Sequence, residues 1–174
     1  MTDPGTLNAS RVSHERVVLD QIRASFAGAP DLVLTGGQGL ANRFAVPAWE
    51  LLPHQQSQFG DLRLEGTSCT VVVEVESAGG VTNLVKYWPY LAAGARRKRF
   101  VLVHLFRLIS KQDYIAHRRL WTFLVERMQE DLERRCNVRW PQGWEARQFT
   151  YGTELDVSQP VAFIREALAT APAS

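Results

Sequence analysis

The chain has 174 residues, of which 45% are hydrophobic and 22% charged, and these are ordinary shares for one globular domain. A net charge of +2 is too small to indicate a partner, and no apolar run is long enough to span a membrane. The first residues lack the pattern of a secretion signal, and Cys69 and Cys136 have no nearby cysteine. We therefore expect a cytoplasmic protein with reduced thiols and no structural zinc site.

The N-terminal third predicts one helix and two shorter elements within a single domain over residues 12–170. Residues 1–11 and 171–174 are expected to be disordered tails. Ser13 is expected to cap a helix that ends near Phe26, with Glu15 in the first turn, where an acid suits the helix dipole. A short strand is expected over residues 31–34.

A short helix over residues 47–52 would carry Glu50, and a polar loop follows it. His54 lies in this loop. A single loop histidine is more typical of a surface residue than of an acid–base group.

Residues 58–91 contain three acids in a pattern that packing alone does not require. Asp61 opens a run of alternating apolar residues, and Glu74 and Glu76 interrupt a valine-rich strand predicted over residues 70–77. Side chains alternate along a strand, so one face should hold Val72, Glu74 and Glu76 and the other Val71, Val73 and Val75.

A hairpin of these two runs would bring Asp61 close to Glu74. Carboxylates gathered in this way repel each other and lose hydration, so a cation such as Mg²⁺ or Mn²⁺ would stabilise them. The alternative is that the acids are the solvated face of a half-buried sheet. Val72 on the same face, and the apolar residues around it, favour a central strand.

The second half predicts a helix from Thr82 to Leu91, which Pro89 should kink or end early. A buried strand over residues 100–106, a long helix over residues 110–135 and a final helix over residues 157–169 follow. Tryptophans in the loop near residue 140 either stack on bases or pack on the long helix, and packing is favoured.

Positive charge gathers in this half: residues 94–140 hold 12 Lys and Arg against 5 Asp and Glu. The cluster Arg96, Arg97 and Lys98 is expected to bind backbone phosphates, although such runs are often solvated loops.

The acids and the helix after them resemble the PD-(D/E)xK nuclease superfamily. The superfamily's first acid corresponds to Asp61 and its strand acid to Glu74. Most members have a lysine two residues after the strand acid; this chain has Glu76 there, as do restriction enzymes that carry Glu-x-Glu. The segment from Asn83 to Tyr87 is similar to the family branch with a Gln-x-x-x-Tyr motif, with Asn replacing Gln. The resemblance implies an α/β, restriction-endonuclease-like fold with a mixed central sheet flanked by helices.

The resemblance also implies a nuclease that hydrolyses phosphodiester bonds, with DNA as the expected partner and Mg²⁺ or Mn²⁺ as cofactor. Asp61, Glu74 and the carbonyl of Val75 would bind the metal. Glu76 would orient or deprotonate a water molecule or bind a second ion. Lys86 would supply the missing positive charge from the helix.

Asn83 and Tyr87 would hold these groups in place or contact the nucleic acid, and Glu15 and Glu50 are candidate extra ligands. The competing interpretation is an inactive nuclease-like module that binds nucleic acid or a protein, which the Glu76 replacement favours. Pairing of two copies to form a homodimer stays open.

Overall fold

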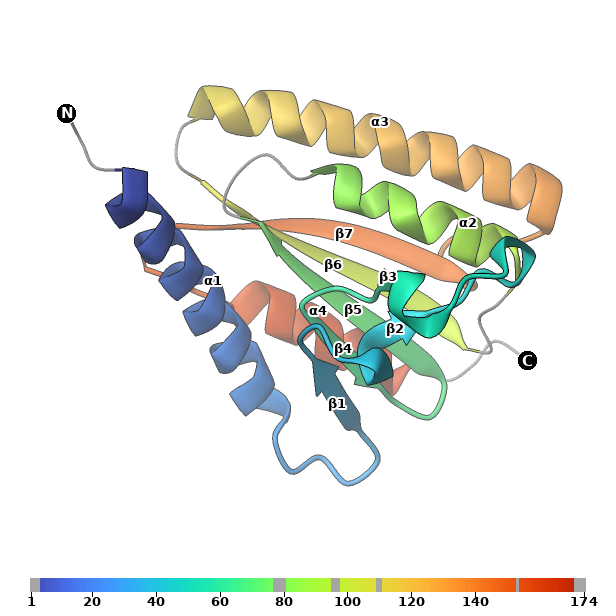
Figure 1. The fold of residues 1–174 in the computed structure, drawn as a ribbon, viewed down its shortest axis with the longest axis horizontal. Helices are drawn as coiled ribbons and strands as arrows, with labels where there is room; N and C mark the ends of the chain where they lie inside the picture. Colours follow the sequence, from blue (N-terminus) through green and yellow to red (C-terminus); the bar gives the residue numbers. More distant parts are fainter. Residues whose placement is uncertain (1–3, 77–80, 95–97, 109–110, 153, 171–174) are drawn as a thin grey trace.

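A five-stranded mixed sheet forms the centre of the molecule (Figure 1). The computed structural model describes residues 4–76, 81–94, 98–108, 111–152 and 154–170. The strand order is β1-β4-β5-β6-β7, antiparallel from β1 to β5 and parallel from β5 to β7. These strands are β1 (Val33–Gly36), β4 (Leu62–Glu65), β5 (Cys69–Glu76), β6 (Arg99–Arg107) and β7 (Trp144–Tyr151).

Helices cover both faces of the sheet, so the predicted α/β class with a mixed sheet flanked by helices is confirmed (Figure 1). One face packs on α1 and α4, which contribute Ile22 and Ile164 to its core. The other packs on α2, α3 and a 3-10 helix, which contribute Leu91, Met128 and Leu84. The helices are α1 (Pro4–Phe26), η4 (Val81–Lys86), α2 (Tyr87–Ala92), α3 (Lys111–Cys136) and α4 (Ser158–Ala169).

β5 divides these two cores, because it is buried on both faces from Cys69 to Val75. Its odd-numbered valines pack with α1 and α4, whereas Val72 packs with α2 and α3. This is the predicted alternation, and it places Glu74 on the α2 side of the sheet.

A small second sheet lies over the α2 side, with β2 (Arg43–Phe44) antiparallel to β3 (Ser57–Gln58). Three 3-10 turns connect these segments: η1 (Leu40–Asn42), η2 (Pro47–Trp49) and η3 (Pro53–Gln55). The short helix expected over residues 47–52 is thus a single 3-10 turn that ends before Glu50, whose φ of 48° is left-handed.

Some predicted boundaries were wrong. α1 begins at Pro4, ahead of the expected cap at Ser13. Proline suits the first turn of a helix, since its missing N–H has no helical partner there. β1 ends at Gly36, two residues later than expected, because it pairs with β4.

The segment after β5 begins as the 3-10 helix η4 and becomes α-helical at Tyr87. Pro89 therefore lies in the first turn of α2, which satisfies the expectation of an irregular helix. Gly79 and Gly80, residues that favour a sharp reversal of the chain, lie outside the described residues.

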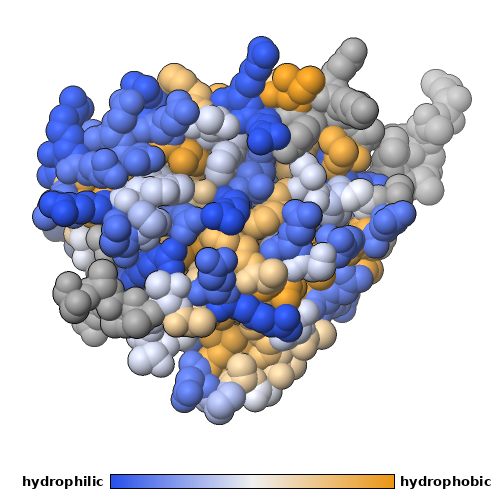
Figure 2. Space-filling model, turned by 180° about the vertical axis from the view of Figure 1, so that it is seen from behind, coloured by the Kyte–Doolittle hydropathy of each residue, from blue (hydrophilic) through white to orange (hydrophobic). Residues whose placement is uncertain are grey.

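The surface on the α4 side is mixed, with an apolar patch low on this face (Figure 2). The patch lies at the height of the loop after α1, where Phe26, Leu32 and Leu168 help to line a shallow groove. Gly66 also borders this groove, so the groove lies near the opposite end of β5 from Glu76. Among the described residues, no helix is long and apolar enough to cross a membrane.

The packing of α3 makes a first prediction about stability. Met128→Ala should lower the free energy of unfolding by about 2–5 kcal/mol, because Met128 is fully buried between α3 and the sheet. Phe123→Ala on the outer face, where 54% of the residue is exposed, should change it by less than about 0.5 kcal/mol. Urea denaturation measures both. Equal losses would contradict the placement of the two faces of α3.

Candidate functional site

Glu74 is a buried carboxylate at the C-terminal end of β5, with only 5% of the residue exposed. Its Oε1 lies 2.5 Å from Lys86 Nζ and accepts a hydrogen bond of 2.5 Å from the hydroxyl of Tyr87. Both partners come from the η4–α2 segment. A buried carboxylate is stable only when it is paired and hydrogen-bonded, so this segment compensates the charge that β5 buries.

Asp61 lies beside Glu74, at the entry to β4. Its backbone N–H donates to the Val73 carbonyl, and its Oδ2 accepts a 2.8 Å bond from the N–H of Val75. The hairpin of β4 and β5 thus brings Asp61 to the end of β5 that carries Glu74, as the sequence predicted.

Glu76 follows on the same face of β5 and is half-buried. Its Oε1 accepts a very short hydrogen bond from the side-chain amide of Asn83 on η4. Asn83, Lys86 and Tyr87 therefore all contact the acids of β5. Tyr87 is fully buried, so its hydroxyl holds Glu74, and the expected contact between this side chain and nucleic acid is not supported.

The acids perturb one another electrostatically. Burial raises the pKa of Asp61 to about 6; the Val75 N–H opposes this rise, and the charges of Glu74 and Glu15 add to it. Burial also raises the pKa of Glu76 to about 7, with a further rise from Glu74 that Asn83 opposes. Both shifts arise mainly from burial, with a further contribution from the neighbouring carboxylates.

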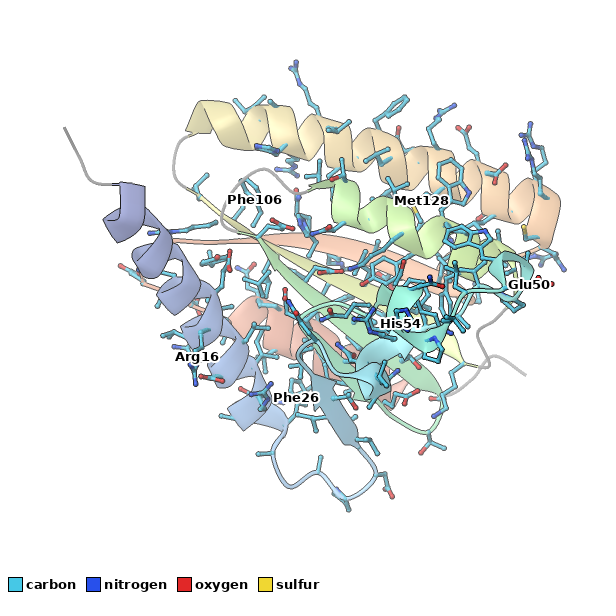
Figure 3. The ribbon with its side chains drawn as sticks, viewed as in Figure 1. Arg16, Phe26, Glu50, His54, Phe106 and Met128 are labelled. Carbon is cyan, nitrogen blue, oxygen red and sulfur yellow. The ribbon has the colours of Figure 1, made fainter. Side chains whose placement is uncertain are left out.

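Glu15 on α1 acts on these acids through its charge. It is half-buried, and its charge acts on both Asp61 and Glu76. Glu50 does not join these acids: Glu50 is exposed and lies well away from Phe106, the residue of β6 that pairs with Glu76 (Figure 3). His54 is exposed on the η3 turn, which fits a surface role.

Two neighbouring features position Asp61 and were missed in the sequence. Gly60 N–H donates to the hydroxyl of Tyr87, and a Cβ on Gly60 would lie 2.3 Å from the Val73 carbonyl oxygen. Asn42 is fully buried and its amide donates to the carbonyls of Phe59 and Gly60. A loop asparagine gives no periodic signal, so only the tertiary structure shows this role.

His104 is a further buried polar residue that the sequence analysis missed. It pairs with Glu74 in the parallel register of β5 and β6, and its Nδ1 lies 3.0 Å from Gln148 Nε2 on β7. Burial lowers its pKa to about 4, so the ring is neutral at physiological pH. A single histidine inside the apolar run of β6 was the signal that could have identified it.

The expected phosphate-binding cluster is only partly described. Arg96 and Arg97 lie outside the described residues. Lys98 is half-buried, and its Nζ donates to the carbonyl of Gly66 at 2.7 Å. On α3, Arg134 and Arg135 form ion pairs with Asp131, so part of the basic charge there is offset locally.

The donors at the acidic site are oxygens, which suit Mg²⁺ or Mn²⁺. Within the described part of the chain, no three His, Cys, Asp or Glu side chains lie close enough together to hold a metal ion. Two carboxylates and a backbone carbonyl still fit Mg²⁺, which usually keeps several water molecules and takes one or two carboxylates from the protein.

No family model, no curated protein and no solved structure matches this chain.

The contact at Gly60 makes a second prediction. Gly60→Ala should destabilise the protein by about 1–3 kcal/mol, because the new methyl group must push the Val73 carbonyl away and displace Asp61. Gly39→Ala is the matched control: its φ of −66° suits alanine, and no described atom lies within 4 Å of the added Cβ. Thermal unfolding compares the two, and an unchanged Gly60→Ala protein would contradict the close approach.

The raised pKa of Glu76 makes a third prediction. Folding favours its protonated form, so its contribution to stability is present below about pH 4.5 and is lost as the pH rises through about 7. Glu76→Gln can still accept from Asn83 but carries no charge. The melting temperature of Glu76→Gln minus that of the wild type should therefore increase from pH 5 to pH 8. A difference that stays constant with pH would contradict the raised pKa.

Proposed function

We propose that this chain is a metal-dependent nuclease that hydrolyses phosphodiester bonds in nucleic acid, with DNA as the expected substrate. One observation carries the proposal: Asn83, Lys86 and Tyr87, three polar side chains of one short segment, all contact Glu74 or Glu76 on β5. Buried acids cost free energy even when they are paired, so a sheet with a purely structural role would be at least as stable with apolar residues at these positions. With the strands of the central sheet alone, the order helix, three strands, helix, strand also agrees with the core expected from the resemblance to the PD-(D/E)xK superfamily.

Asp61, Glu74 and the Val75 carbonyl would hold a Mg²⁺ or Mn²⁺ ion. Burial raises the pKa of Asp61, and a bound cation would favour its charged carboxylate. When bound, the ion would lower the pKa of a water molecule and offset charge on the phosphate.

The other side chains have separate tasks in this proposal. Glu76, with a pKa of about 7, is suited to accept a proton from the attacking water near neutral pH. Lys86 would stabilise the negative charge that develops on the phosphate, and 24% of its side chain is exposed for this contact. Asn83 and Tyr87 act as positioning residues that fix Glu76 and Glu74.

A second candidate is a nuclease-like module that binds nucleic acid without cutting it. The position of Glu76 favours it, because a carboxylate there repels phosphate where the superfamily usually has lysine. The ion pair of Lys86 with Glu74 also leaves this lysine less available to a substrate. Both cysteines are free, which fits a reducing compartment such as the cytoplasm for either function.

Cleavage assays with Mg²⁺ or Mn²⁺ on plasmid, linear duplex and single-stranded DNA test the proposal. The wild type should cut at least one substrate, and Glu74→Gln should reduce the rate by about 10²-fold or more. Glu145→Gln is the matched control, since Glu145 is also buried but pairs with Arg99 away from the site. It should keep its activity.

Thermal unfolding with added metal distinguishes the two candidates. Mg²⁺ or Mn²⁺ should raise the melting temperature of the wild type and have less effect on Glu74→Gln. DNA binding without cleavage and without metal stabilisation would overturn the nuclease and support the binding module.

A further inference from the structure

A cavity of about 440 Å³ lies on the α2 side of the sheet, outside the acidic site. Four aromatic side chains line it: Phe44 from β2, Phe59 beside β3, Tyr90 from α2 and Phe100 from β6. Their rings are in mutual contact, with centroids 4.9 Å apart for Phe44 and Tyr90 and 5.7 Å apart for Tyr90 and Phe100. Tyr90 is half-buried, whereas the other three are almost fully buried, so Tyr90 gives the cavity its most accessible ring.

Polar and charged side chains also line this cavity. Arg63, Glu65, Thr70 and Lys98 line it, and the guanidinium of Arg63 lies 4.8 Å from the centre of the Phe59 ring. An apolar ligand would cover these charged groups and remove them from water, which is unfavourable. The lining suits a ligand with a flat aromatic face, polar edges and a negative charge, which is the chemistry of a nucleotide.

The cavity is connected to the acidic site through a single short segment. Phe59 lines the cavity, Gly60 follows it, and Asp61 belongs to the acids. Thr70 at the cavity and Glu74 at the acids lie on the same strand, four residues and thus about 13 Å apart. An unpaired nucleic-acid strand spans such a distance within a few nucleotides.

We propose that this aromatic cavity holds an unstacked base of the nucleic acid, a few nucleotides from the phosphate at the acids, and that the substrate is therefore single-stranded or locally unpaired. A base inside a duplex is stacked and paired, so it cannot enter such a cavity without leaving the helix. The assignment of a single-stranded or locally unpaired substrate rests on the proposed nuclease function. Binding of a base in the cavity does not depend on cleavage.

A binding experiment without metal tests it, using a fluorescent single-stranded oligodeoxynucleotide and an abasic strand of the same length, with EDTA to prevent cleavage. Anisotropy should show that the wild type binds the strand with bases at least about tenfold more tightly than the abasic strand. Ala45→Trp, at an exposed residue of the cavity lining, should remove this preference while abasic binding stays the same. Tyr90→Leu should also weaken it.

Ala116→Trp, on the exposed face of α3, is the control for an added indole and should bind as the wild type does. A preference for bases that survives both Ala45→Trp and Tyr90→Leu would overturn the proposal, as would a wild type that binds both strands equally. Cleavage by the wild type is measured separately. Loss of the preference in Ala45→Trp, together with no cleavage of any substrate, would support the base site and contradict the nuclease.

Discussion

The structure depends on the compensation of one buried carboxylate. Glu74 lies in a strand that is covered on both faces, so its charge must be paired within the protein. Lys86 and Tyr87 meet that requirement from a segment that follows β5 after a short connection. The position of η4 and α2 over the sheet is therefore fixed by charge as well as by apolar packing. Asp61 and Glu76 add negative charge that this pairing does not offset.

The same face of the sheet carries two different kinds of surface. At the end of β5 that carries Glu76, polar groups gather beneath η4, and toward Thr70 aromatic rings gather beneath the small sheet of β2 and β3. The segment from Phe59 to Asp61 belongs to both, and the buried amide of Asn42 holds its backbone. A change at Asn42 or Gly60 would therefore affect both regions together.

Local patterns in the sequence were sufficient for the parts of the fold that follow a simple period. The alternation of β5 placed its valines and acids on the correct faces, and the hairpin expected of the two runs brings Asp61 to Glu74. The resemblance implied that Asn83 and Lys86 act beside the acids, and both contact them. In each case a neighbour in sequence is also a neighbour in space.

Contacts between distant segments could not be predicted in this way. The pairing of β5 with β6 places His104 beside Glu74, but no local pattern gives the order of parallel strands. Asn42 reaches Phe59 and Gly60 through tertiary hydrogen bonds of a loop. The aromatic cavity joins rings from four segments, each of which looks like an ordinary core residue in its own stretch.

The 3-10 pitch of η4 has a geometric consequence for the acids. With three residues per turn, Asn83 and Lys86 are eclipsed along one edge, whereas an α-helix would offset them by about 60°. Pro89 has no N–H to bond back to Val85, so the α-helix cannot extend through that turn toward β5. Pro89 thereby keeps the Asn83 amide and the Lys86 ammonium group in line with Glu76 and Glu74. These two glutamates share one face of β5 because side chains alternate along a strand.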